Sequence, residues 1–303
     1  MFRKILIANR GEIAVRIIRA ARELGITTVA VYSKADKEAL HTLLADEAVC
    51  IGPAKSTESY LNMNAVLSAA VLTGSEAIHP GFGFLSENSK FATMCEEVGI
   101  KFIGPSGAVM DLMGDKINAR AQMIKANVPV IPGSDGEVHT SDEALAIAEK
   151  IGYPVMLKAS AGGGGKGIRK VEKAEDLAAA FESASSEAKA AFGNGAMYME
   201  RVIYPARHIE VQILADQHGH VVHLGERDCS LQRNNQKVLE ESPSVAIGKT
   251  LRCQIGEAAV RAAQSVGYEN AGTIEFLFDE GKREFYFMEM NTRVQVEHPI
   301  TEF

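Results

Sequence analysis

Short apolar runs alternate with amphipathic stretches through the first third of the chain. The apolar runs have the length of buried strands and lie at 4–8, 27–32, 77–78 and 101–103. The amphipathic stretches have helical periodicity and lie at 11–24, 60–73 and 88–98. In the first of them, Ile13, Ile17 and Leu24 share one face, and Gly25 is typical of a helix C-terminus. Repeated strand–helix–strand units predict an α/β fold whose parallel sheet is covered by helices on both faces.

The pattern changes after Gly104–Ser106, which we take as the end of this first unit. A predicted helix at 115–126 leads into 129–133, a segment rich in proline and glycine that is typical of a hinge. The residues after the hinge predict a compact unit of two helices and three strands. The remainder of the chain is rich in strands and has one predicted helix, at 251–266.

A chain of 303 residues is long enough to form two or three domains. We predict an N-terminal domain at 1–114 and a second domain at 115–303. Within the second domain, a lid subdomain spans about 133–203. The composition, 46% hydrophobic and 23% charged, is that of ordinary soluble globular proteins.

Charge and cysteine content narrow the class of protein. The formal net charge of -7 argues against a surface for nucleic acid. The cysteines are far apart, without the spacing of metal ligands, and indicate free thiols in a reducing compartment: Cys50, Cys95, Cys229 and Cys253. No apolar run approaches the about 20 residues needed to span a bilayer, and 5–8 is too short for the core of a signal peptide. We therefore expect a cytoplasmic protein without membrane or nucleic-acid partners.

A glycine loop, 162–167 with the sequence GGGGKG, follows an apolar strand that ends at Lys158. Glycines expose backbone N–H groups that form a concavity for anions, and flanking lysines add positive charge. The P-loop pattern does not fit, because Lys166 is followed by Gly167 and not by serine or threonine. The next residues, 168–171, are strand-like and not helical, which disfavours a dinucleotide fold. The alternatives are a β-hairpin that closes over a triphosphate, as in ATP-grasp ligases, or a flexible surface turn.

Five motifs occur in order along the chain, at Ile7–Ala14, His79–Asn88, Gly104–Ser106, Met113–Lys116 and Glu289–His298. Together they closely resemble biotin carboxylase, the component of acetyl-CoA carboxylase that uses ATP and bicarbonate to carboxylate biotin. The resemblance covers all 303 residues. It implies a Rossmann-like N-terminal domain followed by an ATP-grasp fold with a mobile lid. Pyruvate and propionyl-CoA carboxylases carry the same domain, so the parent enzyme stays open.

The resemblance also implies the reaction and its partners. Bicarbonate attacks the γ-phosphate of ATP to give carboxyphosphate, whose CO2 carboxylates biotin on a biotin carboxyl carrier protein. The expected cofactor is a pair of Mg2+ or Mn2+ ions. Carboxyltransferase subunits would use the product in fatty acid synthesis. A helix face with Arg16, Arg19 and Glu23 resembles the family's dimer contacts, so a homodimer of the full-length protein is expected, although a solvated helix surface explains the same residues.

Matching motifs assign the nucleotide site by resemblance. The phosphate-binding positions are Lys116, Lys158, Gly164, Gly165, Lys166 and Gly167. The segment Met199–Ile203 resembles the hinge that binds adenine, and it contributes Glu200, Arg201 and Ile203. Further nucleotide contacts are expected from His208, Gln232, Asn235, Glu275 and Glu289. Taken alone, such lysines and a strand histidine are ordinary surface or core residues.

Two carboxylates, Glu275 and Glu289, lie in consecutive apolar strands at 273–278 and 284–290, joined by a segment that can close a hairpin. Strand alternation is consistent with both carboxylates facing one side of a sheet. Hard oxygen ligands suit Mg2+ or Mn2+. Asn291 joins them as a metal ligand by resemblance. Without the resemblance, paired glutamates on a hairpin are more often a solvated face.

Arg293, Gln295 and Glu297 alternate along a stretch that we expect to be extended, with these three side chains on one face. The guanidinium of Arg293 can bind an anion through two parallel N–H groups, and Gln295 can orient that anion. Glu297 is the candidate base for bicarbonate, which requires hydrogen-bond reach more than an unusual pKa. By resemblance, Lys237 and the backbone N–H of Val296 complete the bicarbonate site. The catalytic residues are then Glu297, Arg293 and Lys237; the other interpretation of the stretch is an amphipathic edge strand.

Two features depart from the family pattern. Asn235 stands where family members usually have histidine, so a titratable proton is lost. Family members also continue well beyond Phe303, so we expect a fragment that binds ATP with weak or no carboxylase turnover. Two alternatives remain. One is another ATP-grasp ligase, such as a half of carbamoyl phosphate synthetase or an amino-acid ligase; the other is a nucleotide-binding module without catalysis.

Overall fold

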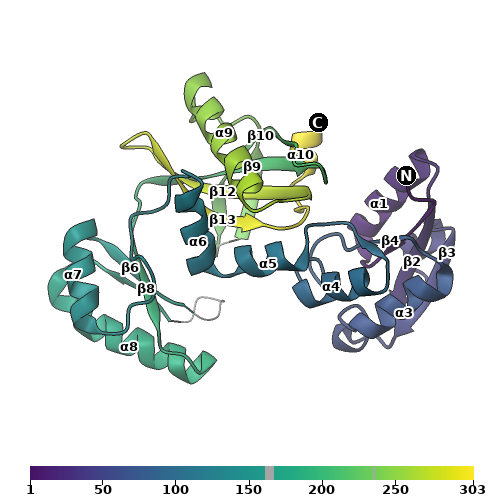
Figure 1. The fold of residues 1–303 in the computed structure, drawn as a ribbon, viewed down its shortest axis with the longest axis horizontal. Helices are drawn as coiled ribbons and strands as arrows, with labels where there is room; N and C mark the ends of the chain where they lie inside the picture. Colours follow the sequence, from purple (N-terminus) through teal and green to yellow (C-terminus); the bar gives the residue numbers. More distant parts are fainter. Residues whose placement is uncertain (161–166, 235) are drawn as a thin grey trace.

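The computed structural model describes residues 1–160, 167–234 and 236–303 of the chain. The described residues form three sheets, which lie in separate parts of the molecule (Figure 1). The first sheet lies at the N-terminal end, a small sheet lies at the opposite end, and the largest sheet lies between them. This arrangement confirms a mixed α/β fold whose N-terminal part is built on a parallel sheet.

The first sheet has the strand order β3-β2-β1-β4-β5, and all its neighbours are parallel. Its strands are β1 (Lys4–Ile7), β2 (Thr27–Ser33), β3 (Glu47–Gly52), β4 (Ala77–His79) and β5 (Lys101–Phe102). Its helices are α1 (Gly11–Glu23), α2 (Leu40–Leu44), α3 (Met63–Thr73) and α4 (Ser89–Glu97), with 3-10 turns at Lys34–Asp36 and Ser56–Glu58. The helix expected from residue 60 begins at Met63, because the Asn62 side chain accepts from the N–H of Ala65 and caps it there.

Strand alternation explains why helices cover both faces of this sheet. On β1, Ile5 and Ile7 pack with Ile13 and Ile17 of α1. Leu6 points to the opposite face and joins a second apolar cluster that includes residues of α3 and α4. The predicted parallel sheet with helices on both sides is therefore present.

Two helices, α5 (Gly107–Gly114) and α6 (Lys116–Lys125), connect the first sheet to the rest of the molecule (Figure 1). The Ser106 side chain caps α5, a helix that the sequence pattern did not predict. The Asp115 carboxylate accepts from the N–H groups of Ile117 and Asn118 and so caps α6. This cap fixes Lys116 as the first residue of its helix.

The segment predicted as the lid contains a three-stranded antiparallel sheet, β7-β6-β8, and two helices. Its elements are α7 (Ser141–Ile151), β6 (Val155–Ala159), β7 (Ile168–Val171), α8 (Ala174–Phe192) and β8 (Met197–Arg201). On β6, Val155, Leu157 and Ala159 are buried against the helices. Alternation therefore places Lys158 on the sheet face that the helices leave uncovered.

The central sheet is antiparallel and has the order β11-β10-β9-β12-β13. Its strands are β9 (Ala206–Ala215), β10 (Val221–Arg233), β11 (Gln236–Glu241), β12 (Asn270–Asp279) and β13 (Glu284–Asn291). Helix α9 (Lys249–Ser265) packs on one face together with α5 and α6, around a core that includes Ile209, Ile274 and Phe276. The alternate positions on β9 and β12 face away from this core. A short helix, α10 (Pro299–Glu302), ends the chain.

The predicted hinge holds the lid by backbone contacts. The N–H of Arg201 donates to the carbonyl of Pro132 at 2.8 Å, and the N–H of Ser134 donates to the carbonyl of Met199 at 2.8 Å. Gly133 lies between these two bonds, and a β-carbon there would stand 2.4 Å from the Met199 carbonyl oxygen. Only glycine fits this approach without a shift of the backbone.

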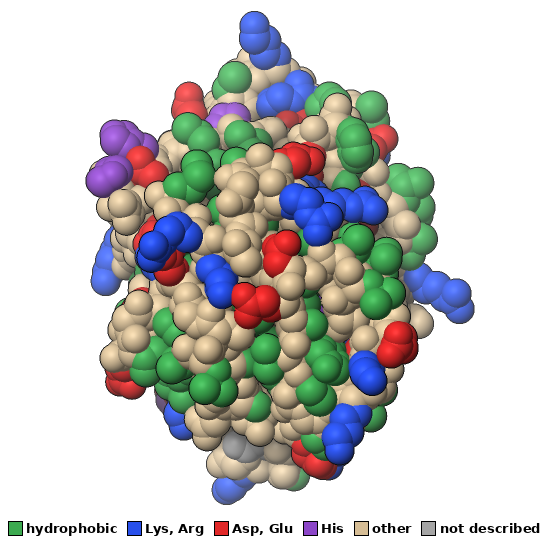
Figure 2. All heavy atoms as spheres, turned by 90° about the vertical axis from the view of Figure 1, so that its right-hand side faces the viewer, with side chains coloured by type: hydrophobic (Ala, Val, Ile, Leu, Met, Phe, Trp, Pro, Cys, Tyr) green, Lys and Arg blue, Asp and Glu red, His purple; other side chains and the backbone are tan. Residues whose placement is uncertain are grey.

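No helix in the described ranges is long and apolar enough to cross a membrane. On the face formed by the N-terminal end, basic and acidic side chains are interspersed (Figure 2). The formal net charge of the chain is -7.

Gly133→Ala tests the close approach at the hinge. The added methyl group must displace the backbone of β8, and such overpacking costs about 1–3 kcal/mol. We expect a lower melting temperature by calorimetry or circular dichroism. Gly114→Ala is the matched control, because a β-carbon at Gly114 meets nothing within 4 Å. Equal melting temperatures for the two variants would contradict the steric argument.

Candidate active site

Two neighbouring cavities meet at the central sheet. The first has a volume of about 470 Å³ and is bounded by α6, the hinge, the lid and β13. The second has a volume of about 800 Å³ and lies over the strands β9 to β13. Met288 and Glu289 line both cavities. A long ligand could therefore extend from one cavity into the other past Glu289.

The first cavity brings together cationic groups from separate elements. Lys116 enters it from the start of α6, and Lys158 enters from β6. Lys158 Nζ lies 2.5 Å from Glu200 Oε2 of β8, and it also lies 5.5 Å from the centre of the Tyr198 ring. The structure thus places Lys116, Lys158 and Glu200 around one cavity.

The glycine loop is only partly within the described residues. Gly164, Gly165 and Lys166 lie outside them, and so does Asn235. Gly167 is described, and it has a φ of 68°, which favours glycine. Strands β6 and β7 pair antiparallel on either side of the loop, with Lys158 opposite Ile168. The expected hairpin is therefore present up to the limits of the described chain.

Arg201 and Ile203, which follow Glu200, were predicted to contact the nucleotide, but they lie outside both cavities. The side chains of Arg201 and Ile203 line neither cavity. Ile203 packs with Ile131 and Tyr286, and Arg201 Nη2 donates to Tyr286 Oη at 3.3 Å. The N–H of Arg201 also donates to the carbonyl of Pro132, so the structure does not bring these two predicted contacts to either cavity.

Arg120 lines the first cavity, and it is not among the site residues predicted from the sequence. Its Nη1 donates to the carbonyl of Ile131 at 2.5 Å, while its buried Nε has no hydrogen-bond partner among the described residues. Burial lowers the pKa of this guanidinium. An arginine among polar residues of an amphipathic helix gives no sequence signal, because burial by a distant segment decides its environment.

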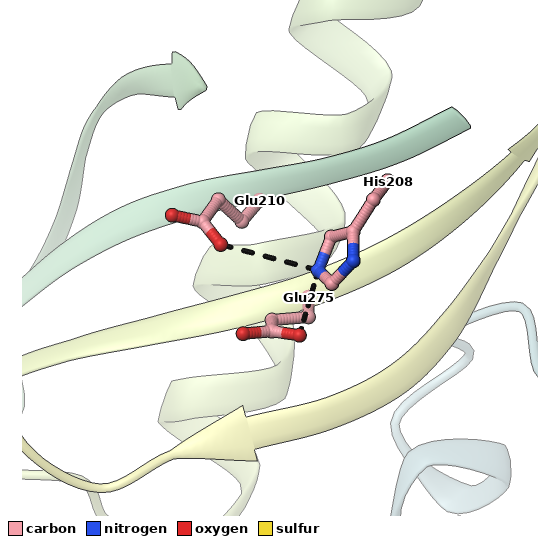
Figure 3. Close-up of side chains that lie close together, drawn as sticks. All are labelled: His208, Glu210 and Glu275. Atoms are coloured by element: carbon pink, nitrogen blue, oxygen red, sulfur yellow. Dashed lines mark ion pairs between the residues drawn. The ribbon is translucent and has the colours of Figure 1, made fainter. Parts of the chain in front are cut away.

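The second cavity is built on cross-strand neighbours. Glu275 on β12 stands opposite Glu289 on β13 and opposite Glu210 on β9. His208 Nε2 lies 2.7 Å from Glu275 Oε2 and 3.9 Å from Glu210 Oε2, and Figure 3 shows the imidazole between the two carboxylates. Gln232 Nε2 lies 2.9 Å from His208 Nδ1. His208 Nε2 has no hydrogen-bond partner among the described residues, so its contact with the two carboxylates is one of proximity.

Lys237 lies at the centre of this cavity and contacts three carboxylates. Its Nζ is 2.5 Å from Glu210 Oε2, 3.0 Å from Glu275 Oε1 and 2.6 Å from Glu297 Oε1. An ammonium has three N–H donors, so all of them have acceptors. Burial alone would lower the pKa of Lys237, but the negative charges of Glu275 and Glu210 outweigh it and raise the pKa above its ordinary value. The lysine is therefore firmly protonated.

The paired carboxylates Glu275 and Glu289 differ in their proton affinity. Burial opposes ionisation of Glu275, but His208 and Lys237 outweigh burial and lower its pKa to about 2. For Glu289, burial and then the charge of Glu275 raise the pKa. Glu289 lines both cavities, and it has no ion-pair partner within 4 Å among the described residues.

The donors suit a hard divalent cation at Glu275, Glu289 and Asn291. Asn291 Nδ2 donates to Glu275 Oε1 at 2.7 Å, so the amide stands beside the carboxylate pair. Other three-residue groups, His208–Glu210–Glu275 and Glu210–Cys229–Glu297, share Glu210. Both oxygens of Glu210 already accept from cations, Oε1 from Arg227 at 2.6 Å and Oε2 from Lys237. These groups therefore fit an ion-pair network. Glu275 belongs to the same network, since its Oε1 accepts from Lys237 at 3.0 Å and its Oε2 lies 2.7 Å from His208 Nε2, whereas Glu289 lies outside it.

The segment after Asn291 differs from the expectation. It is irregular and forms a turn at 296–298, so the prediction of an extended stretch with alternating faces is wrong. The turn nevertheless places Arg293, Gln295, Val296 and Glu297 around the second cavity. The Glu297 side chain is 9% exposed, and Val296 is 62% exposed. Val296 is thus an exposed residue of the turn at the edge of this cavity.

Arg293 connects this segment to the N-terminal part of the chain. Its Nε donates to Glu87 Oε2 at 3.0 Å, and its Nη2 donates to Asn291 Oδ1 at 3.3 Å. Glu87 belongs to the motif at 79–88, which lies in the first unit of the fold. The guanidinium of a predicted anion-binding residue is therefore oriented by both parts of the molecule.

Comparison with known proteins agrees with this geometry. Residues 1–110 match the family "Biotin carboxylase, N-terminal domain", and residues 115–303 match "Carbamoyl-phosphate synthase L chain, ATP binding domain". The chain is 58% identical to biotin carboxylase 1 of Bacillus subtilis over 302 residues, which is 100% of this chain and 67% of that protein. It is 56% identical to a pyruvate carboxylase chain of Methanothermobacter thermautotrophicus over 302 residues, which is 100% of this chain and 61% of that protein.

A solved structure has the same fold over the whole chain. The biotin carboxylase domain of 2-oxoglutarate carboxylase from Hydrogenobacter thermophilus, a dimer in complex with MgADP, ADP and bicarbonate, superposes with a TM-score of 0.89 at 53% identity. The match covers 100% of this chain and 66% of that chain. The chain belongs to the biotin carboxylase family, whose members are ATP-dependent ligases with an ATP-grasp domain. It spans about two thirds of the length of these relatives.

The lowered pKa of Glu275 predicts how stability depends on pH. Because the folded-state pKa lies below the ordinary value of 4.5, this carboxylate contributes stability that is present above that value and is lost as the pH falls toward 2. Glu275→Gln should cost roughly 3 kcal/mol at neutral pH and flatten the loss of stability in acid. The measurement is denaturant unfolding between about pH 7 and pH 3.

Glu240→Gln is the control within the same cavity. Burial and then the charge of Glu297 raise the pKa of Glu240, so its ionised form destabilises the fold at neutral pH. The amide should therefore leave stability at neutral pH unchanged or higher. Parallel pH profiles for the wild-type protein and Glu275→Gln would contradict the assignment.

Proposed function

We propose that this chain binds ATP with Mg2+ or Mn2+, and bicarbonate, for the ATP-dependent carboxylation of biotin. One observation carries the proposal. Glu297, the candidate base, lies 2.6 Å from Lys237 in a cavity that adjoins the lysine-lined cavity at Glu289. An anion in the second cavity and a nucleotide in the first would meet at that junction. This is the arrangement that phosphoryl transfer to bicarbonate requires.

ATP occupies the first cavity in this proposal. Lys116 and Lys158 contact the phosphates together with the loop at 164–167. Glu200 accepts from the exocyclic amine of adenine, while backbone groups at Arg201 and Ile203 contact the base. The remaining nucleotide contacts are His208, Gln232, Asn235, Glu275 and Glu289. This division is supported by the positions of Lys116, Lys158 and Glu200 around one cavity.

Glu275, Glu289 and Asn291 would hold the divalent ions, which neutralise phosphate charge during transfer. The oxygen donors, the cross-strand pairing of Glu275 with Glu289 and the contact of Asn291 with Glu275 support this assignment. The family predicts two ions, Mg2+ or Mn2+. The binding and deprotonation of bicarbonate depend on side chains of the chain itself.

Bicarbonate occupies the second cavity near Lys237 and Arg293, with Gln295 and the backbone N–H of Val296 as further donors. Glu297 takes the proton of bicarbonate, and a bicarbonate oxygen then forms a bond to the γ-phosphorus as the bond to ADP breaks. The resulting carboxyphosphate breaks down to phosphate and CO2. A ureido nitrogen of biotin then forms a bond to the CO2 as its proton passes to the released phosphate. Arg293, Lys237 and Glu297 are the proposed catalytic residues.

The partners follow from this reaction. The acceptor would be biotin on a biotin carboxyl carrier protein, and carboxyltransferase subunits would use the product. We propose acetyl-CoA carboxylase and fatty acid synthesis as the setting, a cytoplasmic location, and a homodimer of the full-length protein. The biotin carboxylase domain of a pyruvate or propionyl-CoA carboxylase is the alternative setting, and a pyruvate carboxylase chain is among the similar proteins. We propose domains at 1–114 and 115–303, with a lid at 133–203.

Glu297→Gln tests the role of the base. It keeps the shape of the side chain but cannot accept the bicarbonate proton. We expect bicarbonate-dependent ADP release to fall by about 10²–10⁴-fold, because general bases contribute that much. Biotin should stimulate the reaction of the wild-type chain. Glu240→Gln is the control, since Glu240 lines the same cavity without a proposed role. An unchanged rate for Glu297→Gln would exclude it as the base.

Lys158→Gln tests the nucleotide site without requiring turnover. ATP with Mg2+ should raise the melting temperature of the wild-type chain, since a ligand that binds only the folded state stabilises it. The variant should lose most of this rise, because it loses a phosphate-binding cation. Lys170→Gln is the control, as Lys170 is an exposed residue of the same lid. ATP stabilisation without bicarbonate-dependent turnover would identify a binding module that is catalytically incomplete.

A further inference from the structure

A fully buried arginine, Arg227, lies beneath the second cavity on β10 and is 0% exposed. A guanidinium has five N–H donors, and each of them has an acceptor here. The acceptors are Glu210 Oε1 at 2.6 Å, Gln212 Oε1 at 2.8 Å, Thr301 Oγ1 at 2.8 Å, Thr273 Oγ1 at 3.1 Å and Gln295 Oε1 at 2.9 Å. Because every N–H group of Arg227 has an acceptor, the guanidinium is held in one position and orientation.

Among these acceptors, Gln295 is a proposed contact of bicarbonate. Its Oε1 accepts from Arg227 Nη2, and its Nε2 donates to Glu275 Oε1 at 3.1 Å. A flipped amide would place a donor against the guanidinium, which has no acceptor, and an oxygen against a carboxylate, which has no donor. The orientation thus follows from the chemistry of both neighbours and not from the assignment of the amide atoms.

The orientation decides what Gln295 can offer to a ligand. Its side chain is buried but lines the second cavity. With Oε1 held by Arg227, the amide presents its NH2 group, whose only acceptor among the described residues is Glu275. One N–H is left for an anion. An amide in the opposite orientation would present an oxygen, which repels an anion.

We propose that Arg227 is a positioning residue for the bicarbonate site, which holds the Gln295 amide with its NH2 group toward the bound anion. The inference rests on the proposed function of the second cavity. Arg227 does not touch the substrate and acts through Gln295. Lysine cannot replace it, because an ammonium lacks the planar fork that binds Glu210 through Nε and Gln295 through Nη2 at once.

The test uses Arg227→Lys, Gln295→Met and the double variant. Loss of a hydrogen bond to a charged group predicts that Arg227→Lys raises the KM for bicarbonate roughly tenfold. The KM for ATP and the rise in melting temperature caused by ATP should stay at wild-type values. Gln295→Met should give a similar KM for bicarbonate, and the double variant should be no worse than Gln295→Met.

Two results would overturn the role of Arg227. In the first, Arg227→Lys changes the KM values for bicarbonate and ATP alike, or changes only the melting temperature, as a purely structural residue would. In the second, the effects of Arg227→Lys and Gln295→Met multiply in the double variant. That outcome would mean that Arg227 does not act through Gln295.

A readout without turnover separates this inference from the proposed function. If the wild-type chain shows no bicarbonate-dependent ADP release, the catalytic part of the proposed function fails for this chain, while the binding of ATP is tested separately by the melting temperature. The side-chain amide of Gln295 can still be followed by NMR, with its signals assigned by their absence in Gln295→Met. We expect a pair of slowly exchanging protons in the wild-type chain and faster exchange in Arg227→Lys. Unchanged exchange would refute the positioning role.

If Arg227→Lys does not fold, two milder variants decide the question. Thr273→Val removes an acceptor of Nη2, the nitrogen that also binds Gln295, whereas Thr301→Val removes an acceptor of Nη1. Both variants lose one hydrogen bond and keep the side-chain shape. We expect Thr273→Val to raise the KM for bicarbonate more than Thr301→Val does. Equal effects would overturn the inference.

Discussion

Balancing charge in a poorly solvated space is the constraint on which the central part of the molecule depends. Glu210, Glu275 and Glu297 have side chains that are 0%, 4% and 9% exposed. Isolated carboxylates in such positions would be very costly. Arg227 and Lys237 compensate them through close ion pairs, and these pairs also fix where the carboxylates can be.

The balance is incomplete, and the uncompensated charge suits a divalent cation. Three carboxylates and two cations leave one negative charge, and Glu289 adds a second at the junction of the cavities. A divalent cation carries the opposite charge. The raised pKa of Glu289, caused by burial and by Glu275, reflects the same deficit. Buried ion pairs contribute little net stability in general, so the network is better understood as a device that fixes geometry.

The regular elements could be predicted well because their signals are local. The parallel sheet of the N-terminal part follows from apolar runs and helical periodicity. The pairing of Glu275 with Glu289 depends in addition on a register shift between Glu275 and Phe276, which regular alternation across the hairpin does not predict. The prediction of an extended stretch from Arg293 to Glu297 was wrong, because the turn at 296–298 has no strong local signal. The roles of Arg227 and Arg120 could not be predicted from the sequence. Both side chains are buried and hydrogen-bonded by segments that are distant in the chain, so their sequence neighbours carry no signal.

The contact between Glu87 and Arg293 has a consequence for how the two parts of the chain can change over evolution. Glu87 follows β4 of the first sheet, while Arg293 follows β13, and the two side chains meet at 3.0 Å. A hybrid protein that takes its first sheet from one relative and its central sheet from another keeps this ion pair only if the first parent supplies Glu87 and the second supplies Arg293. The contact thus couples the segments 79–88 and 291–298, although Glu87 and Arg293 are 206 positions apart in the sequence.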